Sequence, residues 1–382
     1  MLNRRTLRIK AMQTLFAFQT AKKSEFEIAK KNVEDVFLPD MLTMEEQDKG
    51  QLALDRKTAG EAFLKAFKTD LKSIKPDYTE AIFDAVKNGQ VAYQNQIESN
   101  KRSLKKRLIA DTNKIYNVYL EVLALPNELL RIAIHERQRR GIESFNLKSN
   151  KVLEIISKSE LFEKECLKHG ISWQNNQDEL RTWYKEAIKK NETYQAYDEK
   201  DRIDFEDDLQ MILFLFKNII FKDDNISKFF EERDINWSEN KSILKSMVSK
   251  SIKSLENEED ELILMSLSKN WEEDLLFLKD IYDYTVDNEE EYEDIISNKS
   301  KNWEIDRVAL TDKIILEMAV AEMINFPSIP IKVTINEYIE LSKLYSTPKS
   351  KQFVNGILDV LSEELKKEGK IKKSGRGLLD NK

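Results

Sequence analysis

The scarcity of glycine and proline is the feature that most restricts the fold of this chain. Among 382 residues there are only 9 glycines and 6 prolines, and residues 171–326 contain neither type. β-Sheet proteins and α/β nucleotide-binding folds need both residues for tight turns and phosphate loops. Hydrophobic residues make up 41% of the chain, which is enough for a sizeable buried core. The sequence therefore predicts an all-α protein.

Few residues of the kinds that carry catalysis or bind metals are present. The chain has one cysteine, Cys166, and two histidines, His135 and His169, and neither histidine has a spacing typical of a ligand or of a nucleophile's partner. No phosphate-binding glycine loop, zinc-protease motif or nucleophile elbow occurs. We therefore expect no catalytic residue, no metal site and no cofactor.

No segment has the length and apolarity of a membrane span. The most apolar run, Leu209 to Phe221, is interrupted by Lys217 and Asn218 and is shorter than the roughly 20 residues that a spanning helix needs. It is predicted to be a buried core helix. The basic, amphipathic N-terminus is compatible with an organelle transit peptide only if it is dispensable for the fold. We expect no membrane association and a cytoplasmic location.

Charge is distributed unevenly along the chain. The formal net charge of −7 by itself argues against a nucleic-acid-binding protein. However, residues 1–24 carry six basic residues and no acidic one, and the tail 366–382 is also basic. We expect this tail to be disordered. The acidic excess thus lies between two basic ends, so the net charge does not exclude RNA binding.

The basic N-terminal segment has a helical pattern. Leu7, Ala11 and Leu15 recur at helical spacing, which places them on one apolar face. Arg4 and Arg8 lie one turn apart, beside Arg5. Two interpretations remain open: a solvated basic face, or an anion-binding edge at the start of a packed helix.

The last third of the chain predicts a helical bundle. Residues 308–321 are apolar around much of a helix, as in a central helix. Thr334 and Glu337 have the spacing of a capping box, which predicts a helix over 335–345. In the final helix Gly356 costs about 1 kcal/mol relative to alanine, and we expect a close approach of another helix to compensate for it.

A basic turn precedes that final helix. Lys343, Lys349 and Lys351 crowd the chain just before Phe353, where the N-terminus of a helix already attracts anions. Phe353 is open to two interpretations: a platform on which an unpaired base stacks, or a core residue that shares a stripe with Ile357.

Two separated motifs resemble the bacterial NusB transcription antitermination proteins. The first is RRTLRIKAMQTLFAFQ at residues 4–19. The second runs from Pro330 to Lys343 (PIKVTINEYIELSK) and continues as QFVNGILD at residues 352–359. The resemblance covers residues 1–24 and roughly 262–365. It departs from the family at Ser350-Lys351-Gln352-Phe353, where the family often has Ser-His-Lys-Phe.

The resemblance implies a compact helical protein that binds RNA without catalysis. It further implies that the protein, together with the small-subunit ribosomal protein NusE, binds single-stranded boxA-like elements of rRNA transcripts as part of the RNA polymerase antitermination complex. By the same resemblance, the RNA-contact candidates are Arg4, Arg5, Arg8, Lys349, Lys351 and Phe353, and Lys343 joins them because it lies at the same basic turn. Because the ribosomal protein is basic, an acidic face around Asp312 and Glu322 is a candidate partner-binding site.

These expectations divide the chain into four parts. Residues 1–24 form the first helix of a NusB-like core, 25–260 a helical insertion, 261–365 the C-terminal NusB-like bundle and 366–382 the tail. The insertion is compatible with factor binding, with an extended RNA track through Arg137, Arg139 and Arg140, or with bracing of the fold. One alternative function is an interaction scaffold or ribosome-assembly adaptor without boxA specificity. An rRNA methyltransferase is a further alternative, but it requires a glycine-rich cofactor domain that does not follow the module here.

Overall fold

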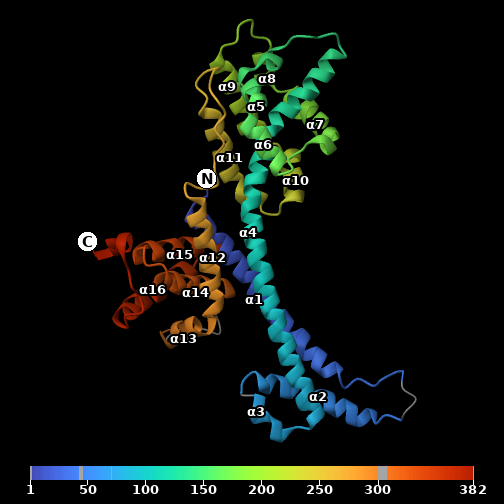
Figure 1. Cartoon of the computed structure of the whole chain (residues 1–382), viewed down its shortest axis with the longest axis vertical. Helices are drawn as coiled ribbons and strands as arrows, with labels where there is room; N and C mark the ends of the chain where they lie inside the picture. The colour runs from blue at the N-terminus through green and yellow to red at the C-terminus, as the bar shows by residue number, and fades with distance from the viewer. Residues whose placement is uncertain (1, 43–45, 70, 300–307, 382) are drawn as a thin grey trace. The chain divides into compact units, whose positions relative to one another are not determined.

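All regular structure in the part of the chain that can be described is helical. The computed structural model describes residues 2–42, 46–69, 71–299 and 308–381, and no β-strand occurs within these ranges (Figure 1). This confirms the all-α fold. Within the same ranges no helix combines the length and the apolarity needed to cross a membrane.

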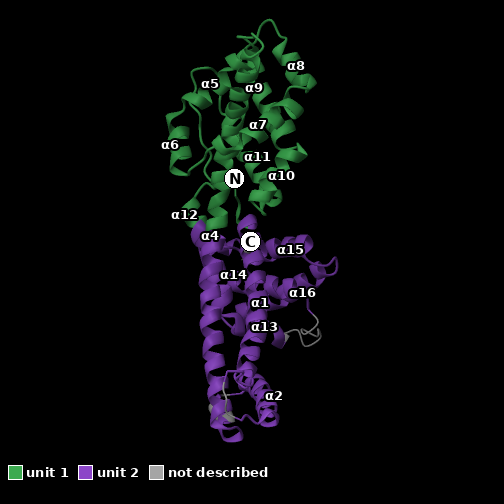
Figure 2. Cartoon of the chain, turned by 90° about the vertical axis from the view of Figure 1, so that its right-hand side faces the viewer, with its two compact units in different colours: residues 1–4, 110–274 green, residues 5–109, 275–382 purple. Residues whose placement is uncertain are grey.

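The chain divides into two compact units, which are coloured separately in Figure 2. Unit 1 comprises residues 1–4 and 110–274, and unit 2 comprises residues 5–109 and 275–382. Helices α4 (Glu80–Gln138) and α12 (Trp271–Asp287) contribute residues to both units.

Unit 1 packs short helices around the second half of α4. These helices are α5 (Lys151–Lys158), α6 (Glu160–Lys168), α7 (Gln177–Trp183), α8 (Glu192–Asp198), α9 (Phe205–Phe214), α10 (Asp224–Arg233) and α11 (Trp237–Lys253). Trp173, Trp183 and Trp237 are buried and form part of the core of this unit. The apolar run from Leu209 forms α9 and a π-helical turn, Leu215–Ile220, and most of it is buried as predicted.

Pro126 does not end a helix, although proline commonly does. It lies inside the 59-residue helix α4. A proline in a helix interior costs about 3 kcal/mol because a hydrogen bond is lost. Around it Leu123, Leu125 and Leu129 are almost fully buried, so burial of this apolar segment offsets the lost bond.

Unit 2 contains most of the N-terminal helix and the C-terminal end of the chain. Its helices, besides the parts of α4 and α12, are α1 (Arg4–Asp35), α2 (Lys49–Ala66), α3 (Leu71–Ile74), α13 (Glu289–Lys299), α14 (Leu310–Asn325), α15 (Ile331–Tyr345) and α16 (Ser350–Lys367). Helix α1 continues without a break past residue 24, where the sequence analysis placed the end of the first segment.

Helices α1, α2 and α4 share a small core built around close backbone approach. Val33, Phe63 and Val86 are almost fully buried in it. A Cβ atom at Gly89 would collide with the Val33 side chain, so glycine is required there by packing rather than by backbone conformation. The first part of the predicted insertion therefore has its own core together with the extension of α1.

Helix α14 is the central helix of the C-terminal bundle, as its apolar pattern predicts. Nearly all its side chains from Ile314 to Met323 are buried. It packs against α13, α15 and α16. Two details nearby differ from the sequence-based expectations.

Helix α15 begins at Ile331, four residues earlier than predicted, and Thr334 does not cap it. The Thr334 hydroxyl instead donates a hydrogen bond to a buried glutamate, described below. Gly356 was predicted to permit close approach of another helix. Instead it faces outward on α16, and a Cβ atom there would meet no heavy atom within 4 Å, so no contact among the described residues requires glycine.

The C-terminal tail forms contacts, in contrast to the expected disorder. The Lys373 ammonium donates to the Phe326 carbonyl at 2.9 Å, and the Ser374 amide donates to the Pro327 carbonyl at 3.0 Å. A 3₁₀ helix follows at Gly375–Asn381. Two main-chain carbonyls after α14 thus serve as acceptors for the tail.

One buried carboxyl group of α14 has no close counter-ion. Glu317 is 1% exposed, and the Lys313 ammonium lies 3.9 Å from its Oε1 but only 2.9 Å from Glu293 Oε1. Burial, with a further contribution from the Glu289 and Glu293 carboxylates, raises the pKa of Glu317 from 4.5 to about 8. The folded protein therefore holds a proton here that the unfolded chain releases above about pH 4.5.

We predict that this proton makes the stability of unit 2 depend on pH. The folded-state pKa is raised, so the free energy of unfolding falls as pH increases from 4.5 to about 8. Glu317→Gln keeps the shape of the neutral acid and removes this dependence. At pH 8.5 the variant is expected to be more stable than the wild type by a few kcal/mol, at about 1.4 kcal/mol per pKa unit, and at pH 4.5 nearly equal. Urea denaturation across this range measures the difference. Parallel pH profiles of the free energy of unfolding for the variant and the wild type would contradict this prediction. Glu290→Gln, at an exposed position, is the control.

Candidate RNA-binding surface

A buried ion pair joins α1 to α14. The Arg8 guanidinium donates through Nε and Nη2 to the two carboxylate oxygens of Glu322, both at 2.7 Å. Arg8 is 2% exposed and Glu322 is fully buried. Two parallel charge-assisted hydrogen bonds fix both the distance and the orientation of the groups.

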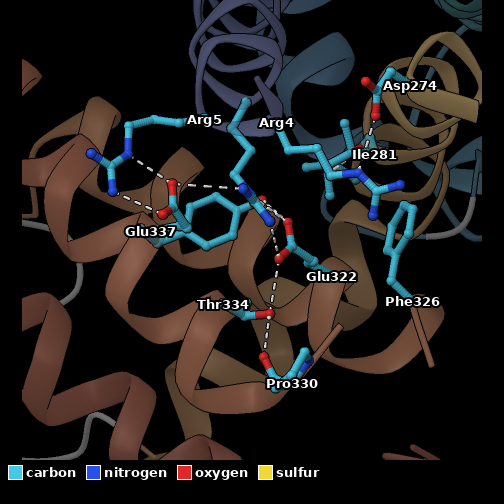
Figure 3. A network of polar contacts seen from close by, with 12 residues as sticks. Arg4, Arg5, Asp274, Ile281, Glu322, Phe326, Pro330, Thr334 and Glu337 are labelled. Atoms are coloured by element: carbon cyan, nitrogen blue, oxygen red, sulfur yellow. Dashed lines mark hydrogen bonds and ion pairs between the residues drawn. The ribbon is translucent and has the colours of Figure 1, made fainter. Parts of the chain in front are cut away.

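The remaining acceptor capacity of Glu322 is filled from α15. The Thr334 hydroxyl donates to Oε1 at 2.8 Å (Figure 3). The Tyr338 hydroxyl donates to Oε2 at 3.1 Å. Each carboxylate oxygen therefore accepts two hydrogen bonds, which offsets the cost of burying the charge. Burial, followed by the Glu322 charge, raises the pKa of Tyr338 well above its usual value, so its hydroxyl stays protonated.

Aromatic rings enclose the same guanidinium. The Arg8 Cζ atom lies 5.2 Å from the ring centroid of Phe277 and 5.8 Å from that of Tyr338. Burial alone would lower the pKa of Arg8, but the Glu322 carboxylate outweighs it and the net direction is upward. Arg8 is thus a permanently charged residue in the interior of unit 2. It is held by the Glu322 carboxylate, by the more distant Glu337 Oε2, 3.7 Å from its Nη1, and by two aromatic faces.

Arg5 lies one turn away and remains accessible. It donates from Nε and Nη2 to the Glu337 carboxylate, both at 2.8 Å (Figure 3), and 43% of its side chain is exposed. The hydrogen bond to Glu337 raises the pKa of Arg5 against the effect of burial. An exposed pair of this kind contributes little to stability, so Arg5 can exchange partners at little cost.

Glu340 marks the place where three of the predicted cations gather. The Lys343 ammonium donates a hydrogen bond to Glu340. That bond is the main cause of the lowered pKa of Glu340, and the charges of Arg5 and Lys351 add to it. Segments from α1, α15 and α16 therefore supply cations to one exposed region. We call Arg5, Lys343 and Lys351 the basic surface.

A chain of hydroxyl groups holds the turn between α15 and α16. The Ser350 hydroxyl donates to Asp312 Oδ2 at 2.6 Å. Ser346 and Thr347 each lie within hydrogen-bonding distance of the Ser350 Oγ atom, at 2.9 and 2.8 Å. Asp312 is buried in the first turn of α14, where the helix N-terminus favours a carboxylate.

The other members of the predicted set have different surroundings. Lys349 is exposed at the end of this turn, and Phe353 is half-buried one turn into α16. Arg4 belongs to unit 1, where its Nε lies 3.2 Å from Asp274 Oδ1 and its Nη2 contacts Glu273. The three arginines of the motif thus have different surroundings. Arg5 belongs to the basic surface, Arg8 is buried in the interior of unit 2, and Arg4 contacts two acids of unit 1.

Three sequence-based expectations differ from the structure for one physical reason. Arg8 was expected to contact RNA, and Asp312 and Glu322 were expected to form an exposed acidic face. All three side chains are buried and engaged by partners within unit 2, so none of them is offered to a ligand. They act as positioning residues for the segments that carry the exposed cations.

Several residues that build this region were not predicted from the sequence. Thr334 and Tyr338 are four residues apart and thus share one face of α15, which was a usable signal for a common buried partner. The contacts of Glu337 and Glu340 with the basic residues were not predicted, because acidic residues on a helix are usually solvated. Within the described ranges no cluster of histidine, cysteine or acidic residues suits a metal ion.

The basic run in unit 1 braces the unit through Arg137. Its Nη2 lies 2.5 Å from Asp198 Oδ2, and its Cζ atom is 4.3 Å from the ring centroid of Phe145. Arg140, in the turn that follows α4, pairs with Glu136 near the end of that helix. Two of the three arginines considered for an extended RNA track therefore already have anionic partners.

Comparison with known proteins assigns a family to the C-terminal part of the chain. Residues 239–363 match the model of the NusB family. The proteins named "Transcription antitermination protein NusB" from Chloroherpeton thalassium and Salinibacter ruber are 53% identical over 74 residues and 44% identical over 73 residues. Each match covers 19% of this chain, with 35% and 46% of the respective relative.

A third relative of the same name, from Koribacter versatilis, is 46% identical over 66 residues, which are 17% of this chain and 45% of that protein. The chain therefore spans between about a third and a half of the length of the curated relatives it matches. No solved structure matches the chain. The resemblance inferred from the sequence is confirmed for residues 239–363, which carry a NusB-family domain.

We predict that the two glutamates facing the arginines of α1 contribute very differently to stability. Glu322→Gln removes the bidentate partner of the buried Arg8 guanidinium and leaves only Glu337 Oε2, 3.7 Å from Arg8 Nη1, as a counter-charge. It should lower the free energy of unfolding by about 3–5 kcal/mol. Glu337→Gln is the matched comparison, because it removes the partner of the exposed Arg5 and only the longer, 3.7 Å contact with Arg8. It should cost much less, about 1 kcal/mol. Urea denaturation followed by circular dichroism measures both. Equal, small losses would refute the role assigned to Glu322.

Proposed function

We propose, from the NusB-family domain at residues 239–363, that this protein is a non-catalytic RNA-binding transcription antitermination factor. In this proposal it acts on boxA-type single-stranded elements of rRNA transcripts, together with the small-subunit ribosomal protein NusE and RNA polymerase. The core for this role comprises the start of α1 and the C-terminal bundle. The names of the three relatives support antitermination, and the substrate and partners are part of the proposal.

The observation that carries the proposal is the convergence of cations on the basic surface. Arg5, Lys343 and Lys351 come from three helices. Arg5 donates to Glu337 and Lys343 to Glu340, two acids one turn apart on α15, and the charge of Lys351 also lowers the pKa of Glu340. Phosphate groups of a single strand bind to such a surface through Lys and Arg contacts. Lys349 and Phe353, in and just beyond the adjoining turn, extend it with another cation and an aromatic ring on which a base can stack.

The buried network supports this role indirectly. Arg8 is held by Glu322, and it fixes the turn of α1 that presents Arg5. Asp312 holds Ser350, and thereby the turn that presents Lys349 and Lys351. RNA binding then requires that Arg5 and Lys343 exchange their ion pairs with Glu337 and Glu340 for phosphate, while the bidentate pair of Arg8 and Glu322 is kept.

The exposed members of the basic surface provide a direct test. Arg5→Gln combined with Lys351→Gln removes two phosphate contacts without touching the buried pair. For a single strand, the slope of log affinity against log salt should become shallower by about 0.7 per lost contact. Fluorescence anisotropy with boxA-like and scrambled RNA, with and without NusE, measures affinity and slope.

The matched control is Lys158→Gln, which removes an exposed lysine of α5 in unit 1. It should leave both quantities unchanged. A folded Arg5→Gln/Lys351→Gln variant with wild-type affinity and slope would exclude the basic surface as the RNA site. Equal, weak binding of boxA-like and scrambled RNA by the wild type, regardless of NusE, would favour the interaction-scaffold alternative instead.

A further inference from the structure

Unit 1 contains a cleft that the proposed function does not use. Its volume is about 710 Å³, and it is bordered by α4, by α6 and by the segment that leads into α12. This volume lies within the range of small-molecule sites, about 300–1,000 Å³. Helices α4 and α6 lie outside residues 239–363, so most of the cleft belongs to the part of the chain that the NusB match does not cover.

Aromatic side chains form part of the cleft wall. Tyr116 and His169 meet edge to face, with ring centroids 5.3 Å apart. Trp271 also lines the cleft and is half-buried, and no hydrogen bond of its indole N–H is found among the described residues. Stacking of a base on an aromatic side chain typically contributes about 1–3 kcal/mol.

Two side-chain amides in the cleft have unused hydrogen-bonding capacity. Asn113 and Asn117 lie one turn apart on α4 and both line the cleft. Within the described ranges neither amide forms a hydrogen bond. An amide presents donors and an acceptor together, which matches the edge of a nucleobase. An apolar ligand would desolvate these groups without replacing their hydrogen bonds.

The charged residues of the cleft favour an anion. Lys114 donates to the carbonyl oxygen of Arg233 at 2.9 Å, and its ammonium has further protons to donate. Lys168 is largely exposed and lies 3.2 Å from Glu165 Oε1. Glu165 is the one acid that lines the cleft, and Lys168 neutralises it. The lining is therefore net positive.

We propose that this cleft binds a nucleotide, with the base against the aromatic side chains and the Asn113 and Asn117 amides, and the phosphate near Lys114. The chemistry is shared by a free nucleoside monophosphate and by an unpaired nucleotide of a bound RNA. This site lies apart in sequence from Arg5, Lys343 and Lys351, so it adds to the proposed function and does not depend on it.

The test uses the full chain and isothermal titration calorimetry. The probes are adenosine and uridine monophosphate, inorganic phosphate and a hexameric single-stranded RNA. Asn117→Ala and, separately, the exposed Asn113→Ala should each weaken nucleotide binding about fivefold, as expected for one lost hydrogen bond. Asn95→Ala, at an exposed position of α4 in unit 2, is the matched control and should bind as the wild type does.

The pattern of binding identifies the source of the nucleotide. Monophosphate binding that both cleft variants weaken supports the site and assigns free nucleotide as a ligand. If only the hexamer binds and both variants weaken it, the site is supported as part of an RNA track. The proposal is overturned if neither the monophosphates nor the hexamer binds, or if inorganic phosphate binds as tightly as the monophosphates. It is also overturned if cleft variants with wild-type circular dichroism bind nucleotide with wild-type affinity.

The Arg5→Gln/Lys351→Gln variant separates this proposal from the proposed function. It should keep full affinity for any monophosphate bound in the cleft. Loss of monophosphate binding in that variant would place the nucleotide on the basic surface and refute the cleft site. Conversely, failure of boxA recognition with intact, asparagine-dependent nucleotide binding would leave the cleft proposal standing.

Discussion

The buried contact between Arg8 and Glu322 is the interaction on which unit 2 depends. It links residues 314 positions apart and connects the first turns of the chain to the central helix of the C-terminal bundle. A buried ion pair contributes little net stability, because the free-energy cost of desolvating the two charges offsets most of their attraction. Its value lies in geometry: four hydrogen bonds to one carboxylate permit a single arrangement of α1, α14 and α15.

The two carboxylates expected to bind a partner instead organise the basic surface from within. Glu322 holds α1, and Asp312 holds the turn before α16 through Ser350. Both belong to α14, so one buried helix sets the positions of exposed cations that come from distant parts of the sequence. In the absence of a ligand, Glu337 pairs with Arg5 and Glu340 pairs with Lys343. Interior acids position the cations, and exposed acids keep them exchangeable.

The sequence predicted the class of the fold well because that prediction depends on local pattern. The scarcity of glycine and proline indicates helices, and the apolar circumference of residues 308–321 indicates a central helix. The motifs also identified the segments that carry the exposed cations. Burial of individual charged residues was not predictable, because Arg5 and Arg8 have the same chemistry and differ only in their tertiary partners. The same limit applies to Thr334, whose spacing suits a cap but whose hydroxyl turns to a buried acid.

A double-mutant cycle on Arg8 and Glu322 tests the central claim most directly. The single variants Arg8→Met and Glu322→Gln and the double variant are compared with the wild type by equilibrium urea denaturation. The account predicts that each single change is strongly destabilising, and that the double variant loses less than the two losses added together, since no buried charge is left alone. Additive losses would show that the two side chains stabilise unit 2 independently and would contradict the account.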